Sequence, residues 1–170
     1  LAAKRNELIG QYYRLDTHWN EWGASIGFRA FADRLRHQLP ELRWPADPLY
    51  RLQRTDQVAV GDLASFLRLN DVLSESAPVL GLAGLPDEFV QTRYGRDEQV
   101  APAQLATSRV ALSHPVQTRN AGALNQQRVL WLTDSFGWQM RTPMYASFAD
   151  VVQLHWRDAL RNGGGFVRLV

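Results

Sequence analysis

Apolar residues recur at helical spacing near the start of the sequence. Five of them are separated by four, three, four and four positions: Ala24, Phe28, Phe31, Leu35 and Leu39. Residues at this spacing share one face of an α-helix, so the pattern predicts an amphipathic helix. Asn20 is a suitable N-cap before it, Glu21 favours the helix dipole, and Pro40 predicts where the helix ends.

Shorter runs of apolar and β-branched residues predict strands. The clearest is the unbroken run Val-Leu-Trp-Leu at residues 129–132, which is typical of a strand buried on both faces of a sheet. Residues 138–148 after this run can form a helix, and residues 151–155 predict another strand. Weaker strand patterns occur in four further segments: residues 11–15, 49–53, 88–94 and 107–113.

A second, shorter helix is predicted to begin at Asp62, which caps it. Its buried side is expected to contain Leu63, Phe66, Leu67 and Leu69. Residues 74–88 are rich in glycine, proline and serine, which predicts irregular structure. Strands that alternate with helices predict an α/β layered fold, and a chain of 170 residues suits a single domain, residues 1–170. Because the sequence begins with Leu1 rather than methionine, we expect a processed product or an excised domain.

The composition excludes several kinds of chemistry. The chain has no cysteine, so it cannot form disulfides, use a thiolate nucleophile or bind zinc through cysteine. No apolar run is long enough to span a bilayer. The 19 basic residues, all but one of them arginine, are scattered along the chain, which argues against nucleic-acid binding. Arginine suits the recognition of carboxylates, because its guanidinium group can bind both oxygens at once.

The predicted strand at residues 129–132 is followed by an Asp-Ser pair, Asp134 and Ser135. A turn from strand to helix at this point would raise the Ser135 hydroxyl above the edge of the sheet. The same turn would present backbone N–H groups that can stabilise an oxyanion. This combination predicts an acyl-transfer nucleophile. The alternative is an ordinary Asp or Ser cap at the start of a helix.

A serine nucleophile needs a base, and His18 is the best candidate among the four histidines. Asp16 stands two positions before it, and residues i and i+2 of an extended chain project to the same side. Asp16 can then hold one ring nitrogen while the other faces outward, as in a base that is oriented by a carboxylate. The alternatives are a surface ion pair and two ligands of an incomplete metal site.

Four short motifs, taken in order, resemble the alginate O-acetyltransferase family. They are residues 13–20 (Tyr-Arg-Leu-Asp-Thr-His-Trp-Asn), 22–24 (Trp-Gly-Ala), 61–63 (Gly-Asp-Leu) and 129–136 (Val-Leu-Trp-Leu-Thr-Asp-Ser-Phe). Members of that family are SGNH-hydrolase-like domains that acetylate exopolysaccharides in the bacterial periplasm. The resemblance implies an SGNH-hydrolase-like layered α/β fold, with a mostly parallel central sheet flanked by helices. It also implies a permuted triad order, in which the Asp/His pair precedes the serine.

Carried over to this sequence, the resemblance implies Ser135 as the nucleophile, His18 as the base and Asp16 as the residue that orients it. The implied reaction moves an acetyl group through a serine acyl-enzyme to a polysaccharide hydroxyl, with no cofactor and no metal ion. The expected partners are a polysaccharide acceptor, an acetyl donor and other proteins of the exopolysaccharide machinery, all in the periplasm. The alternatives are a carbohydrate acetylesterase with the same triad and a non-catalytic polysaccharide-binding domain.

Three further residues near these motifs are candidates for substrate binding. Trp19 and Trp138 have indole rings that stack well on sugars, although such tryptophans are also common in protein cores. Arg141 suits a uronate carboxylate. The backbone N–H groups of Ser135 and its neighbour are expected to hold the oxyanion, and Asn120 and Asn125 are candidates for a further donor.

Overall fold

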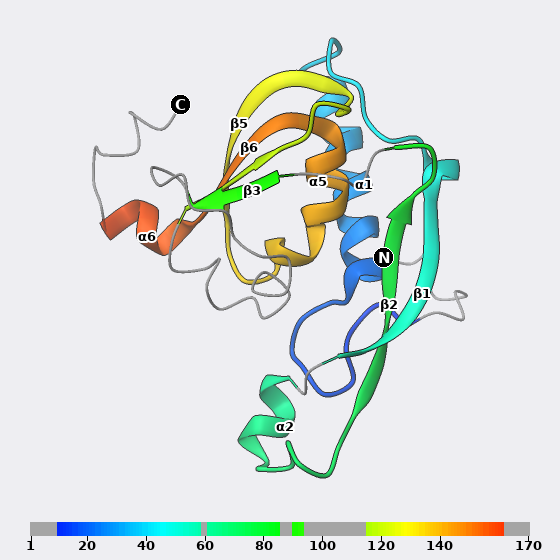
Figure 1. Cartoon of the computed structure of the whole chain (residues 1–170), viewed down its shortest axis with the longest axis vertical. Coiled ribbons are helices and arrows are strands. Elements are labelled where there is room, and N and C mark those ends of the chain that lie inside the picture. Colours follow the sequence, from blue (N-terminus) through cyan, green and yellow to red (C-terminus); the bar gives the residue numbers. More distant parts are fainter. Residues whose placement is uncertain (1–9, 59–60, 86–89, 94–114, 162–170) are drawn as a thin grey trace.

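The computed structural model describes residues 10–58, 61–85, 90–93 and 115–161, which form two β-sheets and several helices (Figure 1). The strands are β1 (Tyr50–Val58), β2 (Glu75–Leu82), β3 (Val90–Arg93), β4 (Val116–Arg119), β5 (Asn125–Thr133) and β6 (Phe148–His155). The α-helices are α1 (Glu21–Arg36), α2 (Asp62–Phe66), α5 (Arg141–Ser147) and α6 (Trp156–Arg161). The 3₁₀ segments η2 (Asp47–Leu49) and η3 (Gly137–Met140) precede β1 and α5. None of the described helices is long and apolar enough to cross a membrane.

The helix predicted from the N-terminal apolar stripe is confirmed as α1. The Asn20 side chain caps it by accepting a hydrogen bond from the Gly23 N–H at 3.0 Å. Phe28 on its inner face is fully buried, whereas Phe31 at the side of the stripe is 44% exposed. The helix ends before Pro40, as predicted.

The larger sheet has the strand order β3-β4-β6-β5, and only the β5–β6 pair of these described strands is parallel. η3 and α5 form the crossover that this parallel pair requires. The other pairs, including β1 with β2 in the smaller sheet, are antiparallel. The prediction of a mostly parallel sheet is therefore wrong. The reason is that residues 120–124, which connect β4 to β5, form a short connection that reverses the chain instead of a helical crossover.

β5 lies at one edge of the sheet that the described strands form, and the exposure of its side chains shows that the prediction that residues 129–132 are buried on both faces is wrong. Leu132 is 50% exposed, and Trp131 is only partly buried. β6 occupies the inner position, where Val151 and Val152 are fully buried. The apolar run thus predicts a strand correctly, but it does not predict the place of that strand in the sheet.

The four weaker strand predictions have different outcomes. β1 and β3 confirm strands near residues 49–53 and 88–94, while residues 107–113 lie outside the described part of the chain. The prediction that residues 74–88 are irregular is wrong for Glu75–Leu82, which form β2 and pair with β1, while residues 86–88 lie outside the described part of the chain. The proline in β2 can be accommodated, since each strand of a two-stranded ribbon has one unpaired edge. Residues 11–15 form a loop with a single bridge, between Tyr12 and Trp19, instead of a strand.

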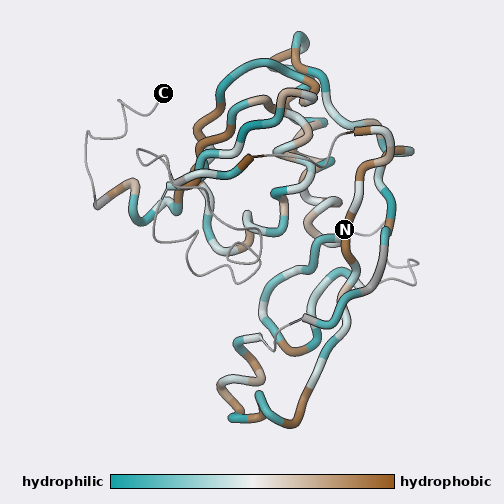
Figure 2. The backbone as a smooth tube through the Cα atoms, viewed as in Figure 1, coloured by the Kyte–Doolittle hydropathy of each residue, from teal (hydrophilic) through white to brown (hydrophobic). Residues whose placement is uncertain are grey.

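The second predicted helix is present as α2, but it does not pack as predicted. Ala64 is its buried residue, whereas Phe66 and Leu67 are 79% and 67% exposed. Figure 2 shows apolar positions in this exposed region at the bottom of the view, away from the larger sheet. The helix is anchored through its N-terminal end, which lies against the loop before α1.

The main hydrophobic core lies between α1, α5, the larger sheet and the β1–β2 ribbon. Its larger members are Phe28, Trp44, Tyr50, Leu80, Leu82, Met144, Tyr145, Phe148 and Val151. Within this arrangement α1 packs against η3. Since one loop leads into α1 and another leads into η3, this packing brings together two segments that are far apart in the sequence.

Two buried tyrosines, Tyr50 and Tyr145, and the partly buried Tyr13 give the fold a predicted sensitivity to alkali. Burial raises the pKa of Tyr13 to about 12, with a further increase from the Glu21 carboxylate, and burial also raises the pKa of Tyr50 and of Tyr145. In the unfolded chain these phenols ionise near pH 10. Since the folded chain holds its phenol protons to higher pH, the free energy of unfolding is expected to fall as the pH rises above about 10.

Tyr50→Phe tests this expectation, because the Tyr50 hydroxyl is buried and has no hydrogen-bond partner among the described residues. The variant is expected to melt at or slightly above the wild-type temperature at pH 7, since an unsatisfied buried hydroxyl is destabilising. Above about pH 10 its melting temperature is expected to fall less steeply than that of the wild type. Tyr12→Phe, at a position that is 54% exposed, is the control. Identical slopes for Tyr50→Phe and wild type would contradict the prediction.

Candidate active site

Ser135 lies in the predicted turn between the end of β5 and η3. The Asp134 side chain accepts hydrogen bonds from the N–H groups of Phe136 and Gly137, at 3.0 and 3.2 Å, and so stabilises the turn. A Cβ atom on Gly137 would lie 1.5 Å from the Thr133 hydroxyl oxygen, so this position requires glycine. The Asp134 side chain therefore closes the turn, and the Ser135 hydroxyl faces the loop before α1.

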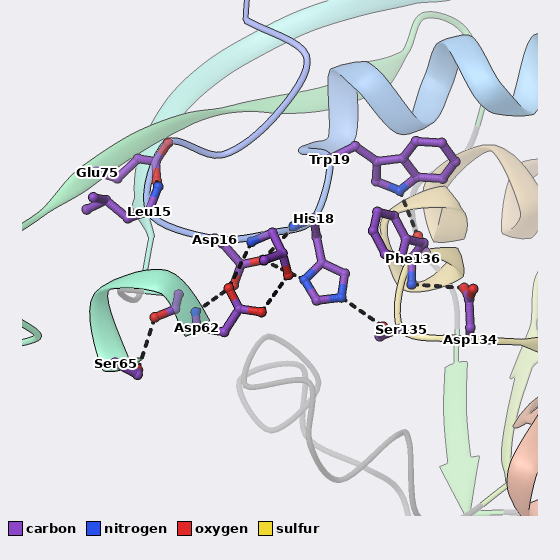
Figure 3. Close-up of polar contacts among 12 residues, drawn as sticks. Leu15, Asp16, His18, Trp19, Asp62, Ser65, Glu75, Asp134, Ser135 and Phe136 are labelled. Carbon is purple, nitrogen blue, oxygen red and sulfur yellow. Dashed lines mark hydrogen bonds and ion pairs between the residues drawn. The ribbon is translucent and has the colours of Figure 1, made fainter. Parts of the chain in front are cut away.

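His18 and Asp16 approach that hydroxyl from the loop before α1 (Figure 3). The His18 Nε2 atom lies 2.8 Å from the Ser135 Oγ atom. On the other side of the ring, His18 Nδ1 lies 2.5 Å from Asp16 Oδ1, which also accepts a hydrogen bond from the His18 backbone N–H at 2.8 Å. The structure thus joins these three residues in one hydrogen-bonded chain, although His18 and Ser135 are 117 positions apart.

Two acidic residues whose role is not evident from the sequence hold this loop. The Glu75 carboxylate accepts hydrogen bonds from the backbone N–H groups of Arg14 and Leu15, the latter at 3.0 Å. The Asp62 carboxylate binds the backbone N–H of Thr17 at 2.8 Å. Asp62 belongs to the Gly-Asp-Leu motif and is also the predicted cap of the second helix. That cap prediction is wrong, because Gly61 occupies the N-cap position of α2 and the Asp62 carboxylate binds Thr17 instead.

Trp19 ties the loop before α1 to the turn that carries Ser135. Its indole N–H donates a hydrogen bond to the Phe136 carbonyl oxygen at 2.7 Å, and the two rings pack edge to face at 5.6 Å. The Phe136 ring in turn contacts the His18 imidazole, with centroids 4.6 Å apart. Trp19 also lines a hollow of about 420 Å³ beside the turn. A substrate contact by Trp19 stays a prediction.

The structure does not support substrate binding by Trp138 and Arg141. Trp138 is only 4% exposed and lies in the core, with the Arg141 guanidinium 5.2 Å from its ring centroid. Arg141 forms an ion pair with the buried Glu21 carboxylate at 2.6 Å. Glu21 also accepts a hydrogen bond from the Leu80 N–H at 2.9 Å, so this group links α1, α5 and β2. Arg141 therefore neutralises a buried carboxylate, and binding of a uronate by its remaining N–H groups stays a prediction.

The turn supplies fewer oxyanion donors than predicted. The N–H of Phe136, the neighbour of Ser135, is already bonded to Asp134. The N–H of Ser135 has no hydrogen-bond partner among the described residues and remains available. The Asn120 side chain donates a hydrogen bond to the Tyr145 carbonyl oxygen, and the Asn125 side chain donates to the carbonyl oxygens of Arg43 and Ser147. Both asparagines therefore stabilise the fold. Of the two turn N–H groups predicted to hold the oxyanion, only that of Ser135 therefore has no hydrogen-bond partner among the described residues.

Asp16, His18 and Asp62 are also the described residues that could hold a metal ion, since their ligand atoms lie within 4.8 Å of one another. Their polar atoms are already used within the protein. The two oxygens of Asp16 bind His18 and the Asp62 N–H, and Asp62 binds Thr17. His18 Nε2 faces Ser135. The arrangement therefore suits proton transfer between a hydroxyl and an imidazole better than it suits a cation.

A family model described as "SGNH hydrolase-like domain, acetyltransferase AlgX" matches residues 1–104 of this chain. The matched part contains Asp16, His18 and Asp62, while Ser135 lies beyond it. No curated protein matches the sequence.

Two solved structures are similar in fold. One is a DHHW family protein from Eubacterium siraeum, with 18% sequence identity and a TM-score of 0.61 over 95% of this chain. The other is PatB1 from Bacillus cereus, with 19% identity and the same TM-score over 86% of this chain. The present chain spans 58% and 54% of those two proteins, respectively. At these identities, the similarity shows the fold alone.

Proposed function

Because this chain belongs to the family of SGNH hydrolase-like domains of the acetyltransferase AlgX, we propose that it transfers acetyl groups to polysaccharide hydroxyls through an acetyl-serine intermediate. The observation that supports the proposal is the hydrogen-bonded chain from Asp16 through His18 to Ser135, with contacts of 2.5 and 2.8 Å. In this role Ser135 is the nucleophile, His18 the general base and Asp16 the residue that orients the imidazole.

In the first step, His18 Nε2 takes the proton of the Ser135 hydroxyl while the oxygen attacks the acetyl carbonyl of a donor ester. The carbonyl oxygen becomes negatively charged, and the N–H of Ser135, which has no hydrogen-bond partner among the described residues, stabilises it. When the tetrahedral intermediate collapses, the donor's C–O bond breaks and its alcohol leaves with the proton held by His18. Asp16 stabilises the imidazolium that exists between these two proton transfers.

In the second step, a sugar hydroxyl attacks the acetyl-serine and His18 again acts as the base. The proton moves from the acceptor hydroxyl to His18 and then to the departing Ser135 oxygen, which restores the starting state. Each step therefore breaks one ester bond and forms another, and no cofactor is needed for the balance of atoms or electrons.

A carbohydrate acetylesterase is the second candidate, because water can replace the sugar hydroxyl in the second step. The side chains of His18 and Asp16 are 23% and 22% exposed, so water reaches this part of the site in the described structure. The triad chemistry is the same for both reactions. The difference lies in whether a bound acceptor excludes water from the acetyl-serine.

The proposal is tested with 4-nitrophenyl acetate as donor, with and without neutral and uronate-containing oligosaccharides as acceptors. An acetyltransferase is expected to produce acetylated sugar, detected by mass spectrometry, and to release less acetate when the acceptor is present. An esterase releases acetate at the same rate with or without the sugar and acetylates nothing. If no acetyl group is released and the oligosaccharide still binds, the chain is a polysaccharide-binding domain and the enzymatic proposal fails.

We also propose, on the family resemblance, that the acceptor is a bacterial exopolysaccharide, that the reaction takes place in the periplasm, and that other exopolysaccharide-machinery proteins are partners. Expression of the full-length protein in bacteria, followed by fractionation of the cells, tests whether the protein is located in the periplasm. Recovery of the protein only in the cytoplasmic fraction would overturn this part of the proposal and leave the chemistry untouched.

A further inference from the structure

We infer that Asp62 is a positioning residue for the triad, acting through Asp16 and the loop that carries His18. The inference rests on the proposed function, since it concerns the same site. It goes further, because the Gly-Asp-Leu motif at residues 61–63 has no role in the two chemical steps themselves.

The contacts between α2 and the loop run in both directions. The Asp62 carboxylate accepts hydrogen bonds from the Thr17 backbone N–H at 2.8 Å and from the Thr17 hydroxyl at 2.5 Å. In return, the Asp62 N–H donates to Asp16 Oδ2 at 3.1 Å, and the Ala64 N–H donates to the Leu15 carbonyl oxygen at 3.3 Å. Figure 3 shows Asp62 directly beside Asp16 and His18.

This exchange determines which oxygen of Asp16 faces His18. Asp16 Oδ2 is bound by the Asp62 N–H, and Asp16 Oδ1 is left to bind the His18 ring at 2.5 Å. Thr17, which the Asp62 side chain holds, lies between Asp16 and His18 in the chain. Asp62 therefore restrains the backbone on which both residues stand, so that the imidazole keeps the orientation that faces Ser135.

Gly61 allows α2 to approach this closely. A Cβ atom at position 61 would lie 2.2 Å from both the Cβ and the Oδ2 atoms of Asp16, so α2 would have to move away. The motif thus combines a small residue at the point of contact with an acidic residue that makes the hydrogen bonds.

Asp62 is charged at neutral pH. The hydrogen bond from the Thr17 hydroxyl is the main reason that the pKa of Asp62 lies below its ordinary value. The lowered value means that the folded state favours the carboxylate, so the contact persists above the usual pKa and is lost only as the pH falls through the lower, folded value. Since the side chain lies near the surface, its direct attraction to the protonated His18 is screened by water. Its effect is therefore expected to come mainly from the hydrogen bonds.

Asp62→Asn and Asp62→Ala test the inference with the donor assay described above. Each is expected to lower kcat on the order of 10- to 100-fold, because small displacements of catalytic groups have effects of this size, while KM stays within about 2-fold of wild type. Gly61→Ala is expected to produce the same pattern with the Asp62 carboxylate intact. Asp33→Asn, which removes an exposed carboxylate of α1, is the matched control and should leave kcat unchanged.

A double-mutant cycle separates positioning from general damage to the fold. If Asp62 acts through Asp16, Asp62→Asn should change kcat by less than about 2-fold in a chain that already carries Asp16→Asn. A loss in the double variant equal to the product of the two single losses would overturn the inference. So would kcat values for Asp62→Asn and Asp62→Ala equal to that of wild type, in a protein whose activity depends on Ser135.

A spectroscopic measurement tests the positioning role of Asp62 even if the proposed enzymatic function is wrong, because it does not depend on catalysis. The ¹H–¹⁵N signals of the His18 imidazole in nuclear magnetic resonance spectra report its hydrogen bonds to Asp16 and Ser135. Asp62→Ala is expected to shift or broaden these signals, whereas Asp33→Asn should not. Unchanged signals would overturn the inference. A wild-type protein without Ser135-dependent activity but with the expected spectral change would refute the proposed function alone.

Discussion

Replacing Ser135 with alanine is expected to lower kcat for acetyl release on the order of 10⁶-fold, while the fold is retained. The substitution removes only the hydroxyl oxygen, which lies 2.8 Å from His18 Nε2. Since the backbone contacts of the turn are made by Asp134, its hydrogen bonds to Phe136 and Gly137 are not disturbed. Initial rates with 4-nitrophenyl acetate measure the effect, and circular dichroism with a melting curve checks the fold.

Two comparisons make this result specific to the triad. Ser76→Ala, at an exposed serine of β2, should have wild-type activity. His18→Ala should lose about as much activity as Ser135→Ala, and the double variant should lose no more than either, because the two groups act in the same proton transfer. Mass spectrometry of wild-type enzyme stopped during turnover should detect one added acetyl group on the peptide that contains Ser135. Full activity of the Ser135→Ala variant would refute the acetyl-serine mechanism.

Replacing Asp16 with asparagine is expected to lower kcat on the order of 10⁴-fold with little change in KM. The asparagine side chain has nearly the same shape, but its amide can donate a hydrogen bond to His18 Nδ1. It then favours the imidazole form that carries its proton on Nε2, and this form cannot accept the proton of Ser135. The amide also removes the negative charge that stabilises the imidazolium.

Steady-state kinetics of Asp16→Asn beside Asp33→Asn provide the measurement. A loss of activity confined to Asp16→Asn supports the assignment of Asp16 as the orienting residue. A loss smaller than about 10-fold would mean that another group orients His18, and the neighbouring Asp62 carboxylate would be the first to examine.

Several features of the site could be predicted because they depend on neighbours in the chain. The spacing of apolar residues predicts α1, and its N-cap Asn20 follows from the side-chain chemistry. The Asp16–His18 contact also follows from proximity in sequence, although the segment is a loop and not the expected strand. The turn after β5 could be predicted because an apolar run followed by Asp134 and Ser135 changes from strand to helix.

Other features depend on partners that are distant in the chain. From the sequence, Trp138 and Arg141 are candidates for sugar binding at the surface. In the structure, Arg141 pairs with Glu21, 120 positions away, and Trp138 is buried beside Arg141. The sequence does not predict β2, because its proline and glycine are typical of irregular segments. This strand is stabilised by its pairing with β1 and by burial of Leu80 in the core. The antiparallel pairings follow from which strands become neighbours, and an apolar run carries no information about that.

Local sequence by itself therefore determined the components of the proposed centre: an Asp-x-His pair, and a serine at the end of a strand. Only the tertiary structure decided that His18 and Ser135 meet, through the packing of α1 against η3, and that Asp62 and Glu75 hold the loop in place. The physical reason is the range of the forces involved. Capping and periodicity act over a few residues, whereas hydrogen bonds and packing between distant segments exist only after the whole chain has folded.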